Sequence, residues 1–157
     1  MFYAWVDDKD KLKETLGLLN SSSPALWGRM DAQQMVEHLI VLYNISNKKQ
    51  ETTILTPEKY LHKSQAFLRS EELMPKNFVA KFLPLNPSPY LYSSLKEAIT
   101  QLSTSLDSFH TYWSGIEEET LNHPVFGKLN KELWDRVHNK HIHHHFLQFG
   151  LLKQLAK

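Results

Sequence analysis

The sequence predicts an all-α protein with four main helices and one short extra helix. Apolar residues recur at three- and four-residue spacing over several long segments, as they do when one face of a helix is buried. Turn-forming stretches separate these segments. The only strand-like segment, FVAKFL, is too isolated to support a sheet.

The composition is that of one globular domain. The chain has 157 residues, of which 41% are hydrophobic and 22% charged, close to the values of an ordinary folded protein. No stretch is typical of a linker between two separately packed halves. We therefore expect residues 1–157 to form a single domain.

The first two helices have clear local signals. Over residues 7–20, acidic residues crowd the start and three leucines share one face, namely Leu12, Leu16 and Leu19. The second helix is expected over 31–47, with Asp31 as its N-cap. His38 lies within the apolar stripe of this second helix, so its side chain is predicted to point into the core.

A short helix and an irregular crossing follow. Thr56 precedes Pro57 and Glu58, an arrangement typical of a helix start, and predicts a connecting helix within 56–73. Residues 73–90 contain four prolines, which remove backbone donors and favour extended conformations. This stretch should cross the bundle as irregular chain and could form a wall or lid.

Two long helices complete the fold. Residues 91–115 repeat apolar side chains over about six turns, and Gly115 is a stop signal. A loop over 119–129 leads to Asn130, a natural N-cap. The remaining chain is predicted to be helical to its end, apart from a weak point at Gly150.

Charge and cysteine content exclude several classes of function. Lysine and arginine number 18 against 17 acidic residues, and the formal charge is +1, so neither a nucleic acid nor a membrane surface is an expected partner. No apolar run is long enough to span a membrane. Cysteine is absent, which leaves nitrogen and oxygen as metal ligands. We expect a cytoplasmic protein.

The last helix carries the strongest functional signal. His141 and His145 lie four residues apart, so their imidazoles stack on one helix face and can converge on one cation. A firm site needs a third ligand from another helix, and His38 is the best candidate. The alternative is that the histidine-rich face is solvated and that His38 is a hydrogen-bonded core residue.

Four further residues could contact the ligands or line a pocket beside them. His138 lies one turn before His141 and is the reserve ligand. His144 borders the ligand face, and Gln34 and Gln148 lie at the edges of the two ligand-bearing faces. His143 points well away from the ligand face and is expected to face solvent or a neighbouring chain.

Three segments together resemble a known family. The pieces WGRMDAQQMVEHL, NHPVFGKL and ELWDRVHNKHIHHHFLQFG are similar to an uncharacterised branch of the DinB-like proteins, which has a W-G-x-M-x-x-x-Q-M-x-x-H segment and a K-H-x-x-H-H-x-x-Q-F-G ending. The resemblance implies a four-helix bundle with a long crossover. It also implies that His38, His141 and His145 hold one zinc- or nickel-like ion. His143 departs from the branch, which often has an acidic residue there.

Two functions compete at this stage. The resemblance implies a metal-dependent transferase or hydrolase acting on a small, thiol-type substrate, because three histidines leave coordination positions open. No catalytic residue can be named, since no carboxylate lies on the ligand face. The alternative is a non-catalytic, metal-stabilised bundle that serves as a binding or homodimerisation module, with four filled positions that could include His138.

Other conspicuous residues are expected to be structural. Glu37 points about 100° away from His38 around the helix and is expected in a surface or interhelical salt bridge. His123 should pack in the loop before the last helix. Trp27 and Trp134 are expected to belong to the core.

Overall fold

Helices make up most of the described chain in this computed structural model, which describes residues 2–76 and 88–152. The segment FVAKFL and most of the proline-rich crossing lie outside the described residues. The elements are η1 (Trp5–Asp7), α1 (Lys9–Leu16), α2 (Ala32–Ser46), α3 (Glu58–Arg69), α4 (Leu95–Trp113), β1 (Leu121–His123), β2 (Gly127–Leu129) and α5 (Lys131–Gln148).

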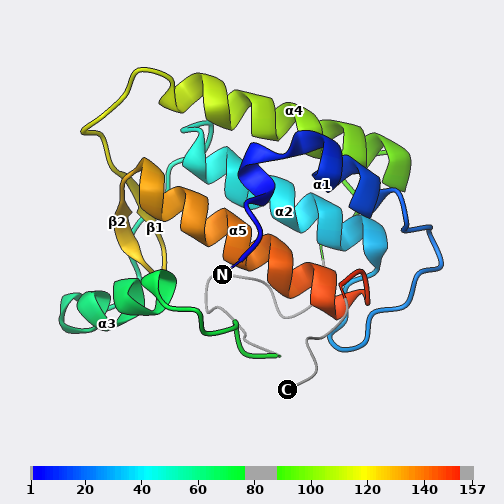
Figure 1. Cartoon of the computed structure of the whole chain (residues 1–157), viewed down its shortest axis with the longest axis horizontal. Helices are drawn as coiled ribbons and strands as arrows, with labels where there is room; N and C mark the ends of the chain where they lie inside the picture. Colours follow the sequence, from blue (N-terminus) through cyan, green and yellow to red (C-terminus); the bar gives the residue numbers. More distant parts are fainter. Residues whose placement is uncertain (1, 77–87, 153–157) are drawn as a thin grey trace.

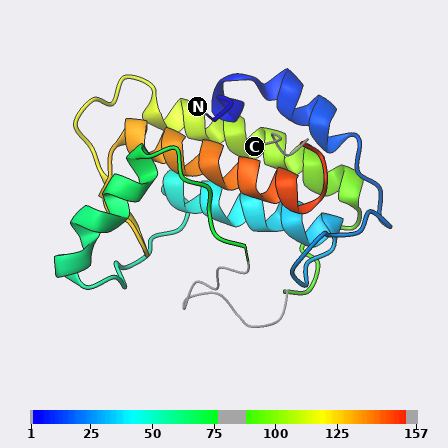
Figure 2. The same cartoon turned by 60° about the horizontal axis from the view of Figure 1, so that its bottom comes forward.

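Three long helices, α2, α4 and α5, lie alongside one another (Figures 1 and 2). The helices α2 and α4 make the most extensive contact and run in the same direction, whereas α5 runs the opposite way. The short α1 packs on α4, and α3 projects beside the hairpin and contacts α5. Because α2 and α4 are parallel, the chain between them has to return along the length of the molecule.

Side-chain caps fix the starts of four helices. The side chains of Asp8, Asp31, Ser94 and Asn130 each accept a hydrogen bond from the backbone N–H three residues later. At α2 the cap is reciprocal, because the Gln34 side chain accepts from the Asp31 N–H. The predicted starts at Asp31 and Asn130 are confirmed.

Two helix ends differ from the sequence-based expectation. The first helix ends at Leu16 and not near residue 20. The last helix ends at Gln148, where the expectation was helix to the end of the chain. Gly150 has a φ of 68°, a left-handed conformation that terminates α5 and that glycine adopts without a steric penalty.

The fourth helix begins at Leu95 and not at the expected residue 91. The N–H groups of Leu91 and Tyr92 donate to the carboxylate of Glu37 on α2, and Ser94 then caps the helix. A tertiary contact therefore holds these residues in a non-helical conformation, which local periodicity cannot reveal.

A small β-hairpin replaces the predicted loop before α5. Its strands pair antiparallel, with Leu121 opposite Leu129 and His123 opposite Gly127. His123 is buried, and its Nδ1 accepts hydrogen bonds from the N–H groups of Val125 and Phe126 inside the turn. This internal bonding supports the predicted packing role of His123 and gives two three-residue strands that are too short to detect from alternation.

The core lies where α1, α2, α4 and α5 meet. Its largest fully buried side chains include Trp134, Tyr43 and Phe109. Trp134 thus matches the expectation of a core residue, whereas Trp27 is only partly buried. No helix in the described part of the chain is long and apolar enough to cross a membrane.

Candidate metal centre

Two antiparallel helices supply the three candidate ligands. His38 lies in the middle of α2, and His141 and His145 lie one turn apart near the end of α5. Because α2 and α5 pack against each other, residues separated by about a hundred positions in the sequence face one another. The predicted third ligand from another helix is therefore where the site needs it.

The three imidazoles converge through their Nε2 atoms. The Nε2 of His141 lies 3.0 Å from the Nε2 of His38 and 3.0 Å from the Nε2 of His145. The rings are edge-to-face, with centroid distances of 4.6–5.0 Å. Their potential ligand atoms all lie within 4.8 Å of one another, so the three histidines could hold a metal ion.

The spacing suits one shared ion. A divalent ion bonds an imidazole nitrogen at about 2.0–2.1 Å, so two ligands of one ion lie at most about 4.2 Å apart. The two 3.0 Å separations satisfy this limit, and the ligand atoms of the third pair, His38 and His145, lie within 4.8 Å. In the part of the chain that the structure describes, this convergent group contains imidazoles alone, without a carboxylate.

The surroundings keep these histidines uncharged. Burial, with a smaller contribution from His144, lowers the pKa of His38 to about 4. Burial also lowers the pKa values of His141 and His145 well below 6.5, and the neighbouring imidazoles lower them further. Neutral imidazole is the form that binds a metal, so no proton has to be removed near pH 7.

The three candidate ligands differ in solvent exposure. His145 is buried, with 5% of its surface exposed, whereas His38 and His141 are partly exposed. His145 is therefore the most enclosed of the three candidate ligands. Such an arrangement differs from a fully enclosed structural site, in which protein groups occupy every coordination position.

Gln148 is joined directly to a candidate ligand. Its Oε1 lies 2.7 Å from the Nδ1 of His145, and its Nε2 donates to the Trp27 carbonyl at 2.9 Å. The sequence analysis placed Gln148 at the edge of the ligand face, and the structure brings it to His145. The part played by Trp27 was not expected from the sequence, because it depends on a backbone carbonyl rather than on the side chain.

His138 faces a different partner. Its Nε2 lies 2.7 Å from the Oγ of Ser46, and its ring stacks on Tyr43 at a centroid distance of 3.8 Å. Ser46 and His138 are both buried. The structure therefore does not bring the reserve ligand to the triad, although it shares a helix face with His141.

His144 lies beside the triad without joining it. Its ring is 5.0 Å from the ring of His145 and 5.7 Å from the ring of Trp27, edge-to-face in both cases. Its neighbour His143 is partly buried and packs on Phe2. The expectation that His143 faces solvent is thus only partly met.

Gln34 lies one turn before His38 on α2, and its hydrogen bonds with the described residues go to groups other than the ligands. Its Oε1 accepts from the Asp31 N–H, and its Nε2 donates to the Ser88 carbonyl. Both ends of the amide are therefore used in holding the start of α2 and the chain before α4.

Glu37 corrects the sequence analysis, which placed it in a surface or interhelical salt bridge. Only 5% of its surface is exposed, and its carboxylate accepts hydrogen bonds from the N–H groups of Leu91 and Tyr92 and from the amide of Gln33. The physical reason is that the chain entering α4 brings two backbone donors to this position. Glu37 is a backbone anchor one residue from a candidate ligand.

Lys140 is a second anchor, and the sequence analysis did not single it out. The side chain is 1% exposed, and its Nζ donates to the carbonyls of Phe67, Ser70 and Glu72 at the end of α3. An ammonium group favours the carbonyl-rich C-terminus of a helix. The available signal was a lysine inside an otherwise apolar and histidine-rich helix segment.

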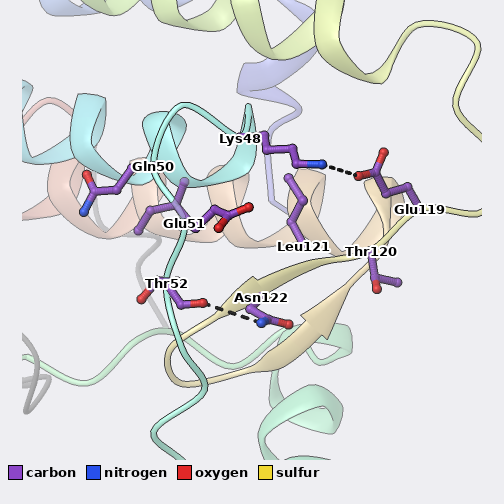
Figure 3. Close-up of a pocket in the computed structure, with 9 residues that line it drawn as sticks. Lys48, Gln50, Glu51, Thr52, Glu119, Thr120, Leu121 and Asn122 are labelled. Carbon is purple, nitrogen blue, oxygen red and sulfur yellow. Dashed lines mark hydrogen bonds and ion pairs between the residues drawn. The ribbon is translucent and has the colours of Figure 1, made fainter.

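A polar cavity of about 290 Å³ lies away from the triad, between the C-terminal end of α2 and the hairpin (Figure 3). An ion pair between Lys48 and Glu119 and a hydrogen bond from Asn122 to the Thr52 carbonyl cross its rim. None of the three candidate ligands lines this cavity.

One family model matches part of the chain. Residues 83–150 are similar to a family described as "Protein of unknown function (DUF1569)". This match covers less than half of the chain and includes His141 and His145 but not His38. No curated protein and no solved structure matches the chain.

Proposed function

We propose that this protein binds one divalent metal ion through His38, His141 and His145 and uses it in small-molecule chemistry. The convergence of the three Nε2 atoms from two helices carries the proposal. A zinc or nickel ion fits neutral nitrogen ligands. The proposed fold is the DinB-like four-helix bundle, formed by α1, α2, α4 and α5 with the crossover between α2 and α4.

Hydrogen bonding alone does not account for the geometry. An Nε2 atom has either one hydrogen or one lone pair, so the His141 Nε2 cannot form two ideal hydrogen bonds at 3.0 Å. A cation between the rings accepts a lone pair from each imidazole. The Nδ1 of His141 is buried without a hydrogen-bond partner among the described residues, so the polar contacts of this ring with those residues are all at Nε2.

The observations favour an open site over a purely structural one. A closed tetrahedral site needs a fourth protein ligand, and His138, the reserve candidate, is bonded to Ser46 instead. His38 and His141 remain partly exposed. These features support a metal-dependent transferase or hydrolase rather than a metal-stapled binding or dimerisation module. The small, thiol-type substrate is what the resemblance to the DinB-like proteins implies.

The chain supplies binding and orientation in this proposal. An ion held by three imidazoles provides Lewis acidity, which lowers the pKa of a bound water or thiol. The three histidines, in their neutral form, would hold the ion, and Gln148 fixes the ring of His145. His144 packs on the ring of His145, and Trp27 packs on His144.

Metal content tests the proposal. Untagged protein is purified without added metal or chelator and analysed for metal, alongside His38→Ala, His141→Ala and His143→Ala. We expect near one equivalent in the wild type, a loss of that metal in the first two variants, and retention in His143→Ala, which removes a histidine packed on Phe2. Little metal in the wild type, even after reconstitution with zinc or nickel, would contradict the proposal.

A further inference from the structure

The loop before α2 is tied to the end of α5 by two hydrogen bonds. The Leu26 N–H donates to the Gln148 carbonyl at 2.7 Å, and the Gln148 side chain donates to the Trp27 carbonyl at 2.9 Å. Gln148 is buried and lies three residues after His145. A loop about 120 residues away in sequence therefore touches the residue that contacts a candidate ligand.

Gly28 allows this close approach. Its φ is +82°, and a Cβ atom there would lie 2.6 Å from the Nε2 of Gln148. Any other residue would combine backbone strain with a clash against the amide. Gly115 offers a contrast, since its φ is +74° but nothing lies within 4 Å of an added Cβ. A side chain at position 28 would thus strain the backbone and would also displace the Gln148 amide from its present position.

The loop determines the orientation of the amide. A backbone carbonyl only accepts hydrogen bonds, so the Trp27 carbonyl selects the Nε2 of Gln148 and turns Oε1 toward His145. Oε1 also only accepts, so the hydrogen of His145 resides on Nδ1. The lone pair on the Nε2 of His145 then faces His141, which is the form that a metal requires.

We propose that the 26–28 loop and Gln148 form a positioning relay that prepares His145 for the metal and, in turn, is held in place when the metal is bound. This inference rests on the proposed metal site. Gln148 is a positioning residue, because it acts through His145 and touches no reacting group. The coupling is reciprocal. If the docked loop increases metal affinity by a given factor, the bound metal favours the docked conformation of the loop by the same factor.

The Trp27 ring reports on the loop. It packs edge-to-face with His144 at 5.7 Å, and the Lys76 ammonium lies 4.8 Å from the ring centroid. Movement of the loop would change both contacts and hence the fluorescence of Trp27. The fluorescence of Trp27 is obtained by subtracting the spectrum of the Trp27→Phe variant from that of the protein that retains Trp27.

The first experiment needs no metal. The tautomer of His145 is read from ¹⁵N chemical shifts in metal-free wild type, Gln148→Ala, Gly28→Ala and Gly115→Ala. We expect the Nδ1–H form in the wild type and in Gly115→Ala, a mixture in Gln148→Ala, and a shift toward a mixture in Gly28→Ala. Circular dichroism and thermal unfolding check that each variant is folded.

The second experiment measures zinc affinity by competition with a chelator. We expect Gln148→Ala to bind roughly 10- to 100-fold more weakly, which is the usual effect of removing a group that orients a metal ligand. Gly28→Ala should lose about 10-fold, and Gly115→Ala should match the wild type. Gln148→Glu retains an acceptor for His145 but faces the Trp27 carbonyl with a carboxylate, so it should restore affinity without restoring the zinc-dependent Trp27 signal.

The outcomes separate the relay from the metal site. If the wild type binds zinc and Gln148→Ala binds it equally tightly with an unchanged tautomer, the relay is wrong and the metal site stands. If the wild type binds no zinc while the tautomers change as expected, the metal site is wrong and Gln148 still positions His145. A zinc-dependent Trp27 signal that survives in folded Gln148→Ala would overturn the coupling.

Discussion

Two regions of α5, one turn apart, use histidine in opposite ways. In the first region, His138 bonds to Ser46, stacks on Tyr43 and lies edge-to-face with Phe109. It is enclosed by aromatic rings and satisfied by a hydroxyl. The Nε2 of His138 is therefore engaged by the Ser46 hydroxyl and is not directed at a metal.

In the second region, His141 and His145 face a third imidazole. Their contacts are with His38 and with each other, and His141 has a buried Nδ1 without a partner among the described residues. The antiparallel packing of α2 against α5 decides which histidine meets which partner, since Ser46 and His38 lie eight positions apart on α2. The role of each histidine is therefore set by the residue of α2 that it faces, and not by its spacing on its own helix.

Removing one histidine from each region should change zinc affinity by very different amounts. His141→Ala removes a proposed ligand and should weaken zinc binding on the order of a thousandfold, equivalent to about 4 kcal/mol. His138→Ala should leave the affinity within about threefold of the wild type. A large loss in folded His138→Ala would show that the two regions act as one site.

Unfolding of the metal-free protein should give the reverse ranking. His138→Ala leaves a cavity among aromatic rings and a buried Ser46 hydroxyl, so we expect a loss of about 3 kcal/mol. His141→Ala should cost less than about 1 kcal/mol, because the residue is only partly buried and its Nδ1 has no hydrogen-bond partner among the described residues to lose. Urea titrations with a chelator present provide the measurement, and equal losses would contradict the assignment.

Lys140 tests whether the turn that carries His141 is also a structural anchor. Lys140→Met should lower the free energy of unfolding by about 2 kcal/mol, because three backbone carbonyls lose a buried donor. Lys131→Met is the matched control. It removes a more exposed ion pair with Asp135 on the same helix and should cost less than about 1 kcal/mol.

The pH dependence of stability follows from the lowered histidine pKa values. Burial lowers the pKa of His38 to about 4 and that of His123 to about 3, from 6.5. Between these values and 6.5 the unfolded chain binds protons that the folded chain does not. The free energy of unfolding of the metal-free protein should therefore fall as pH decreases below 6.5, by about 1.4 kcal/mol per pH unit for each such histidine.

Urea unfolding at pH 7.5, 6 and 5 checks this sign. Stability should level off above pH 6.5, where these histidines are neutral in both states. His38→Ala should reduce the slope by the contribution of one group. A protein that is equally stable at pH 7.5 and 5 would show that these side chains are protonated in the folded state.

The smallest expected effect concerns Gln34. Gln34→Ala removes one half of the reciprocal cap of α2 and should cost about 1 kcal/mol of stability. Zinc affinity should stay within about twofold, since both ends of the amide are used away from the triad. A tenfold loss of zinc affinity would show that Gln34 supports the metal ligands.

The fold was predictable where the signal is local. Apolar periodicity gave the helical class, and Asp31 and Asn130 marked two helix starts because capping is an interaction within four residues. The start of α4 and the role of Glu37 were missed, since both result from one tertiary contact between that carboxylate and the chain at Leu91. The hairpin was missed because three-residue strands lack a detectable period.

The candidate site was predictable in its members but not in its support. The spacing of His141 and His145, together with the place of His38 in the apolar stripe of its helix, identified the three residues that the structure brings together. Spacing placed His138 on the same face, and only the opposing residue Ser46 distinguishes it. The hydrogen bond from Gln148 to the Trp27 carbonyl could not be predicted, because every residue has a backbone carbonyl and the residue type does not reveal which one is used.

The two anchors beside the ligands also bear on how this molecule can change. Glu37 holds the chain at Leu91 and Tyr92, and Lys140 holds it at Phe67 and at two later carbonyls. Each anchor is the immediate neighbour in sequence of a candidate ligand. Insertions, deletions or grafts between residues 73 and 90 are thus bounded by two fixed points. A change in the length of the chain between these two points therefore leaves the helices that carry the triad anchored on both sides of it.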